Sequence, residues 1–90
     1  MPPPMEAQQL VAWNLRRLRV AKGVSQDDLA LSAEIERAYV GYLERGKRNP
    51  TVVTLEKLSN ALGIHISELF TEPEGDVAPI TPLRAGRKKK

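Results

Sequence analysis

The sequence is most informative between Ser25 and Arg45, where it reads SQDDLALSAEIERAYVGYLER. A serine followed by two aspartates is typical of a helix start, because the hydroxyl accepts a free backbone N–H and the carboxylates suit the positive end of the helix dipole. Apolar residues then recur at helical spacing at Leu29, Ala30, Ala33, Val40 and Leu43. The pattern breaks near Glu34, so we expect a helix over about 26–32, a tight turn and a second helix over about 36–45.

Helical patterns continue on both sides of this stretch. Upstream, a helical pattern of apolar residues begins near Ala7 and ends at Gly23. Downstream, a helix begins after Thr51 and ends at Gly63, and one last helical turn follows. The apolar positions of these helices are Val11, Leu15, Leu18, Leu55, Leu58, Leu62, Ile66, Leu69 and Phe70. The sequence therefore predicts an all-α domain of five helices over residues 7–70.

Both ends of the chain differ in composition from this domain. Residues 1–6 contain three consecutive prolines, and residues 71–90 contain three more prolines and finish with RAGRKKK. We expect both ends to be disordered, the second as a basic tail that adds nonspecific attraction to phosphate.

The composition excludes several classes of protein. The chain has no cysteine, so disulfide frameworks and thiolate chemistry are ruled out. We find no pair of carboxylates, nucleophile with a base, metal-ligand set or phosphate loop, and His65 is the only histidine. We therefore predict a protein that is not an enzyme, binds no cofactor or metal, and uses His65 in a loop or cap. Without an apolar run or signal peptide, we expect it in the cytoplasm, at the nucleoid.

Net charge argues only weakly for a nucleic-acid partner. The chain carries a formal charge of +3, but residues 1–70 hold nine basic against eight acidic side chains, whereas residues 71–90 hold five against three. Much of the excess lies in the tail, so any case for DNA binding depends on individual positions.

Four strings resemble a known family: SQDDLA at 25–30, YVGYLERGKRNP at 39–50, TLEKLSNALGI at 54–64 and SELF at 67–70. In this order they resemble the Cro/repressor type of helix-turn-helix, also called the xenobiotic response element family. The resemblance implies a compact lambda-repressor-like fold and a transcriptional regulator that places the second helix of the pair in the major groove of double-stranded DNA.

The resemblance also implies roles for particular residues. Base contacts are expected from Glu36, Arg37, Ala38, Gly41 and Tyr42, and backbone contacts from Gln26, Tyr39, Arg45, Lys47 and Arg48. Arg37 is the main candidate because a guanidinium matches guanine O6 and N7, while Ala38 suits a thymine methyl group. Tyr39 and Tyr42 are both expected to point away from the buried stripe.

Two residues depart from the family pattern. Glu34 stands where relatives place a glycine in the turn, and a non-glycine residue at positive φ is strained. Glu36 stands where Ser or Thr often caps the second helix; its carboxylate opposes phosphate but can accept from a cytosine amino group.

Two further expectations concern scaffold and assembly. Arg19 and Glu44 match a structural pair that ties the first helix to the end of the recognition helix. Relatives dimerise through the region that here contains Ile64, His65, Ile66 and Phe70, so we expect a homodimer on an inverted-repeat operator.

Several functions remain open within this family. The chain can be a repressor or activator, a controller protein of a restriction-modification system, or an antitoxin that binds a partner protein through the tail from Thr71. A protein-interaction adaptor is a further alternative, disfavoured by Gln26, Arg37 and the loop cations.

Overall fold

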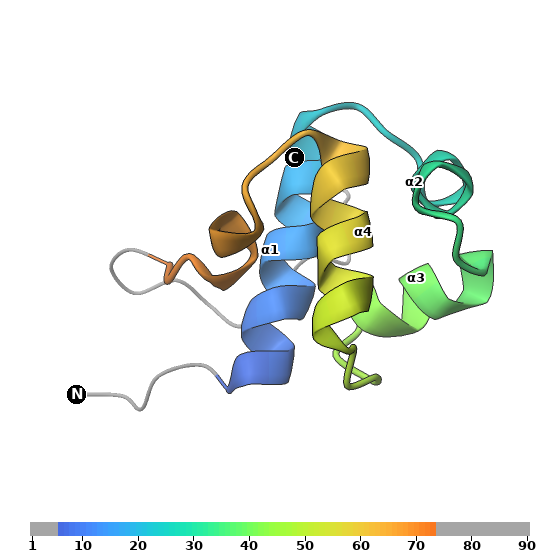
Figure 1. Cartoon of the computed structure of the whole chain (residues 1–90). Coiled ribbons are helices and arrows are strands. Elements are labelled where there is room, and N and C mark those ends of the chain that lie inside the picture. The colour runs from blue at the N-terminus through green and yellow to red at the C-terminus, as the bar shows by residue number, and fades with distance from the viewer. Residues whose placement is uncertain (1–5, 74–90) are drawn as a thin grey trace, which may run out of the picture.

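The computed structural model describes residues 6–73 as four α-helices followed by a short 3-10 helix (Figure 1). The elements are α1 (Ala7–Ala21), α2 (Gln26–Ala33), α3 (Arg37–Glu44), α4 (Val52–Leu62) and η1 (Ile66–Phe70). The predicted all-α class is confirmed, but the fifth element is wrong as an α-helix because its single turn has 3-10 geometry. Residues 1–5 and 74–90, most of the ends predicted to be disordered, lie outside the described residues.

The helix boundaries follow the capping signals in the sequence. Ser25 Oγ accepts the backbone N–H of Asp28 at 2.9 Å, and Thr51 Oγ1 accepts that of Thr54 at 3.1 Å. These two hydroxyls satisfy backbone donors that have no partner inside the first turn of a helix. The predicted starts of α2 and α4 are thus confirmed.

One apolar core joins all five elements. α2 packs against α3 and α4, and α1 packs against α3 and η1. The buried core residues are Val11, Leu15, Leu18, Leu29, Ala30, Ala33, Val40, Leu43, Leu55, Leu58, Leu62 and Leu69. Nearly every apolar residue predicted from helical spacing is therefore buried; the exceptions are Ile66, which is half-buried, and Phe70, which stays 43% exposed.

A buried asparagine holds η1 against the first helix. The amide nitrogen of Asn14 lies 3.0 Å from the carbonyl oxygens of Leu10 and Leu69 and 2.9 Å from that of Thr71. A buried amide needs such partners, and the bonds to Leu69 and Thr71 attach the C-terminal end of the domain to α1. One of these hydrogen bonds reaches Thr71, the residue after η1.

The turn between α2 and α3 contains a strained residue. Glu34 adopts φ 61° and ψ 46°, the left-handed conformation that glycine tolerates best. It follows the end of α2, and the next amide, from Ile35, donates to the carbonyl of Ala30 at 3.0 Å. This hydrogen bond belongs to a common helix-ending motif whose left-handed position is usually glycine. A side chain at position 34 therefore costs stability.

Replacing Glu34 with glycine is expected to raise the free energy of unfolding by about 1 kcal/mol, because the left-handed backbone no longer opposes a Cβ atom. Chemical denaturation of the two proteins measures the difference. Glu34→Ala is the control, since it removes the carboxylate and keeps the Cβ. An equal gain in both variants would show that charge, rather than backbone strain, is responsible.

Candidate nucleic-acid interface

Helices α2 and α3 form a two-helix unit joined by three residues, 34–36. Their observed bounds differ from the predicted ones by one residue at most at each end. Glu36 occupies the N-cap position of α3, and its side chain makes no capping hydrogen bond. Glu36 is exposed, as are Arg37 and Ala38 at the start of α3. The exposed start of α3 is the place where side chains can reach another molecule.

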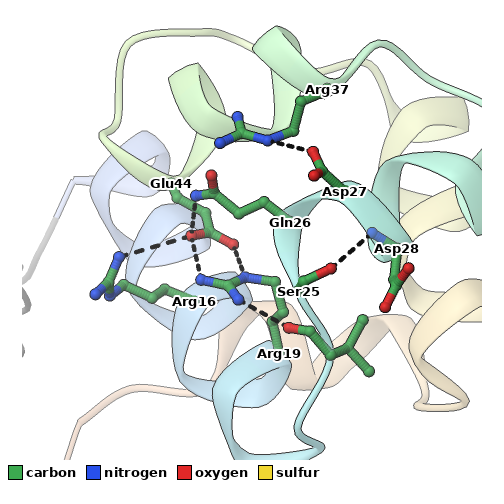
Figure 2. A network of polar contacts seen from close by, with 9 residues as sticks. Arg16, Arg19, Ser25, Gln26, Asp27, Asp28, Arg37 and Glu44 are labelled. Carbon is green, nitrogen blue, oxygen red and sulfur yellow. Dashed lines mark hydrogen bonds and ion pairs between the residues drawn. The ribbon is translucent and has the colours of Figure 1, made fainter.

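The other end of α3 is fixed by a buried carboxylate. The side chain of Glu44 is 1% exposed, and its two oxygens accept from Nε of Arg19 at 2.5 Å and Nη2 of Arg19 at 3.0 Å. Nη1 of Arg16 lies 3.9 Å from the same carboxylate. Figure 2 shows these arginines converging on Glu44 from α1. The structure therefore brings together Arg19 and Glu44, the two residues expected to form a structural pair.

Gln26 joins the same network from the start of α2. Its amide nitrogen donates to Glu44 Oε1 at 2.9 Å (Figure 2). Its backbone N–H lies in the first turn of α2, where intrahelical acceptors are lacking. The side chain therefore braces α3, while the backbone N–H is suited to an anion such as a phosphate.

The side chain of Arg37 makes an exposed ion pair with α2. Its Nε lies 2.8 Å from Oδ1 of Asp27, and the two side chains are 52% and 80% exposed (Figure 2). The sequence pattern assigns Asp27 only to the positive end of the helix dipole. Its contact with Arg37 joins two helices, so no periodicity in the sequence signals it.

Two residues of α3 differ from their expected exposure. Gly41 is buried, and a methyl carbon placed on it would lie 3.2 Å from Nη1 of Arg37 and 3.5 Å from Nη1 of Arg45. Tyr39 is half-buried and packs against the core, so the expectation that it points away from the buried stripe is wrong. It lies four residues before buried Leu43, a spacing that puts both on one helical face.

Basic side chains surround Tyr42 after the end of α3. The guanidinium carbons of Arg48 and Arg45 lie 4.3 Å and 5.1 Å from the centre of the Tyr42 ring. Such cation–π contacts restrict otherwise flexible arginines. Together with exposed Lys47, they place three cations beside the exposed face of α3.

Only some of the residues expected at a dimer interface are exposed enough to contact a second copy of the chain. Ile64 and Ile66 are half-buried and pack against the protein's own core, so each has only part of its surface left for a partner. Ile64 precedes η1, and Ile66 is its first residue. His65 caps η1, since its Nδ1 accepts the backbone N–H of Ser67 at 3.1 Å. Phe70, 43% exposed, remains the main apolar candidate.

Within residues 6–73, no cluster of three or more His, Cys, Asp or Glu side chains is placed to hold a metal. None of the helices in this part of the chain is long and apolar enough to cross a bilayer.

A two-helix unit of this kind, with an exposed second helix flanked by cations, defines a helix-turn-helix domain. The helix-turn-helix family profile matches residues 15–69 of the chain. The chain therefore belongs to this family, and it is a DNA-binding transcriptional regulator of the Cro/repressor type.

Similar proteins include regulators and controller proteins of bacteria. An uncharacterised HTH-type transcriptional regulator of Sinorhizobium fredii, y4dJ, is 43% identical over 67 residues, which are 74% of this chain and 87% of the relative. The control protein C.MunI of a Mycoplasma species is 44% identical over 61 residues, 67% of this chain and 82% of the relative. Among solved structures, the restriction-modification controller protein C.AhdI from Aeromonas hydrophila superposes with a TM-score of 0.68. The aligned region is 46% identical in sequence and spans 70% of this chain and 96% of the C.AhdI chain.

Replacing Glu44 with alanine is expected to lower the free energy of unfolding by about 3 kcal/mol, because it leaves the largely buried Arg19 guanidinium without its counter-charge. Thermal and chemical denaturation measure the loss. Glu56→Ala, at an exposed position on α4, is the control for losing a glutamate. Unchanged stability in the Glu44 variant would contradict a structural role for the pair.

Proposed function

We propose that the protein binds double-stranded DNA sequence-specifically by inserting the exposed face of α3 into the major groove. The observation that carries this proposal is the Glu44 network, in which one buried carboxylate fixes the end of α3 to both α1 and α2. A helix held in this way can present its exposed start in one orientation, as base readout requires. Without that bracing, Arg37 would sample many positions relative to a base pair.

The side chains at the exposed start of α3 are proposed to read base edges. Arg37 suits guanine O6 and N7, and Ala38 suits a thymine methyl group. Glu36, at the N-cap of α3, can accept from a cytosine amino group, which would make it a second specificity residue. Tyr42 is exposed on the same helix and is the proposed contact one turn further along.

The groups around this face are proposed to bind the DNA backbone. The backbone N–H of Gln26 suits one phosphate, and the cations Arg45, Lys47 and Arg48 suit others. These contacts set the register of α3 in the groove and carry no sequence information themselves. Tyr39, half-buried beside the core, has less surface to offer than we had expected.

We further propose that two copies of the chain bind an inverted repeat. A two-fold dimer reads two half-sites about one helical turn apart, roughly 10 bp. Phe70 is 43% exposed beside His65 and the half-buried Ile64 and Ile66. A second copy that packs on the same residues would cover this apolar surface.

The similar proteins favour one biological setting. C.AhdI is named as a restriction-modification controller protein and C.MunI as a control protein. Most of the length of each relative aligns with this chain. We therefore propose that this chain controls transcription of a restriction-modification locus. The residues expected to serve an antitoxin, from Thr71 onward, lie almost wholly outside the described part of the chain.

Selection of duplexes from a random DNA pool is expected to yield one inverted-repeat sequence. On that sequence, Arg37→Ala should cost about 1–3 kcal/mol of binding free energy, whereas on random DNA it should cost little. Titration of both duplexes with both proteins measures this. Equal losses on the two duplexes would assign Arg37 to the DNA backbone, and failure to enrich any sequence would contradict specific binding.

Sedimentation at micromolar concentration is expected to show a dimer that Phe70→Asp converts to a monomer, because the new carboxylate would be buried at the interface. Val52→Asp is the control, since Val52 is 74% exposed and lies on α4 outside the proposed interface. A monomeric unsubstituted protein would overturn the dimer, and a dimer that persists in the Phe70 variant would relocate its interface.

A further inference from the structure

Three polar side chains converge on the bare backbone of Gly41. A methyl carbon built there lies 3.2 Å from Nη1 of Arg37, 3.5 Å from Nη1 of Arg45 and 4.0 Å from Oε1 of Gln26. Two guanidinium groups thus approach a single point on α3. Gly41 is buried because these side chains lie over it, so it offers little surface of its own to a base.

A side chain at position 41 would move Arg37 and leave the fold in place. A contact of 3.2 Å between Cβ and another heavy atom is tighter than most such contacts, so the neighbour must shift by a few tenths of an ångström. That neighbour is the end of an arginine whose side chain is 52% exposed, and it can move without disturbing the core. The Arg37 guanidinium can therefore lie this close to α3 only because residue 41 has no Cβ.

Asp27 fixes the same guanidinium from the opposite helix. Its carboxylate accepts from Nε of Arg37 at 2.8 Å, which leaves the Nη groups of Arg37 as the remaining donors (Figure 2). An exposed ion pair of this kind contributes little to stability, so its effect should be sought in binding.

We propose that Gly41 and Asp27 are positioning residues that present the Nη edge of Arg37 to a base pair, Gly41 by lacking a Cβ and Asp27 by binding Nε. The proposal rests on the proposed function, in which Arg37 reads a base. It reassigns Gly41 from a base contact to the surface on which Arg37 lies. It also gives a role in base readout to a carboxylate that otherwise stabilises the start of α2 and repels DNA.

The test measures a specificity ratio. This ratio is the affinity for the duplex selected by the unsubstituted protein, divided by the affinity for the same duplex with the Arg37-dependent base pair changed. That base pair is the position at which Arg37→Ala loses its preference. Using a ratio removes effects that alter binding to all DNA equally.

Gly41→Ala is expected to lower the ratio about tenfold, as for loss of part of a bidentate contact. The thermal midpoint should stay the same or rise, because alanine favours a helix interior more than glycine does. In an Arg37→Ala background the substitution should leave the ratio unchanged. This combination of equal or higher stability with lower specificity separates positioning from a structural role.

Asp27→Ala provides the second arm, with Asp28→Ala as its matched control. Both aspartates are exposed in the first turn of α2, so each substitution removes one negative charge from the same helix end and should raise affinity for all DNA. Arg37 is paired with Asp27, and Asp28 has no part in that pair. The ratio should therefore fall in the Asp27 variant and stay unchanged in the Asp28 variant.

The outcomes separate this inference from the proposed function. If Arg37→Ala lowers the ratio while Gly41→Ala or Asp27→Ala leaves it unchanged, the role proposed for that residue is overturned and readout by Arg37 stands. Equal falls in the two aspartate variants would assign the effect to charge and overturn positioning by Asp27. If Arg37→Ala loses preference at no position of the selected duplex, base readout by Arg37 is wrong and the inference falls with it.

Discussion

The buried carboxylate of Glu44 is the constraint on which the arrangement of the helices depends. A domain of this size has a modest core, and apolar packing alone tolerates small rotations of short helices. The Glu44 side chain is only 1% exposed, and its buried negative charge does not tolerate such rotations. If its partners moved, the charge would lose the ion pairs and hydrogen bonds that offset its desolvation. Since those partners come from α1 and α2, one residue at the end of α3 fixes three helices relative to one another.

The two ends of α3 differ in how firmly their surroundings hold them. The C-terminal end is held by the Glu44 network and followed by arginines that contact Tyr42. The N-terminal end follows Glu34, which holds a left-handed backbone without being glycine, and begins at Glu36, whose side chain makes no cap. The N-terminal end of α3 therefore lacks both an unstrained turn and a side-chain cap next to the proposed base contacts. Natural proteins commonly give up stability at sites that serve function, and Glu36 fits this view if its carboxylate is kept for a base.

Local chemistry made most of the fold predictable from the sequence, whereas contacts between distant residues escaped prediction. The caps at Ser25 and Thr51 depend on neighbours within a few positions, so spacing reveals them. The strain at Glu34 was expected only from the glycine that the family pattern places there. Asn14 binds carbonyls more than fifty residues away, and Asp27 meets Arg37 across two helices. No period relates such positions. For Arg19 and Glu44, the expectation came from family resemblance because their spacing carries no signal.

The charge distribution favours specificity over bulk attraction to DNA. Residues 1–70 are almost neutral, so the attraction that the described domain offers to phosphate comes from few cations, chiefly those at 45–48. The carboxylates of Asp27, paired with Arg37, and of Glu36, at the N-cap of α3, lie at the proposed reading edge, where they oppose the phosphates of any sequence. Such groups weaken all complexes, but a site that satisfies Arg37 and Glu36 recovers part of the loss. Unfavourable charge then acts against the wrong sequences, which is how a small domain with little net charge can discriminate.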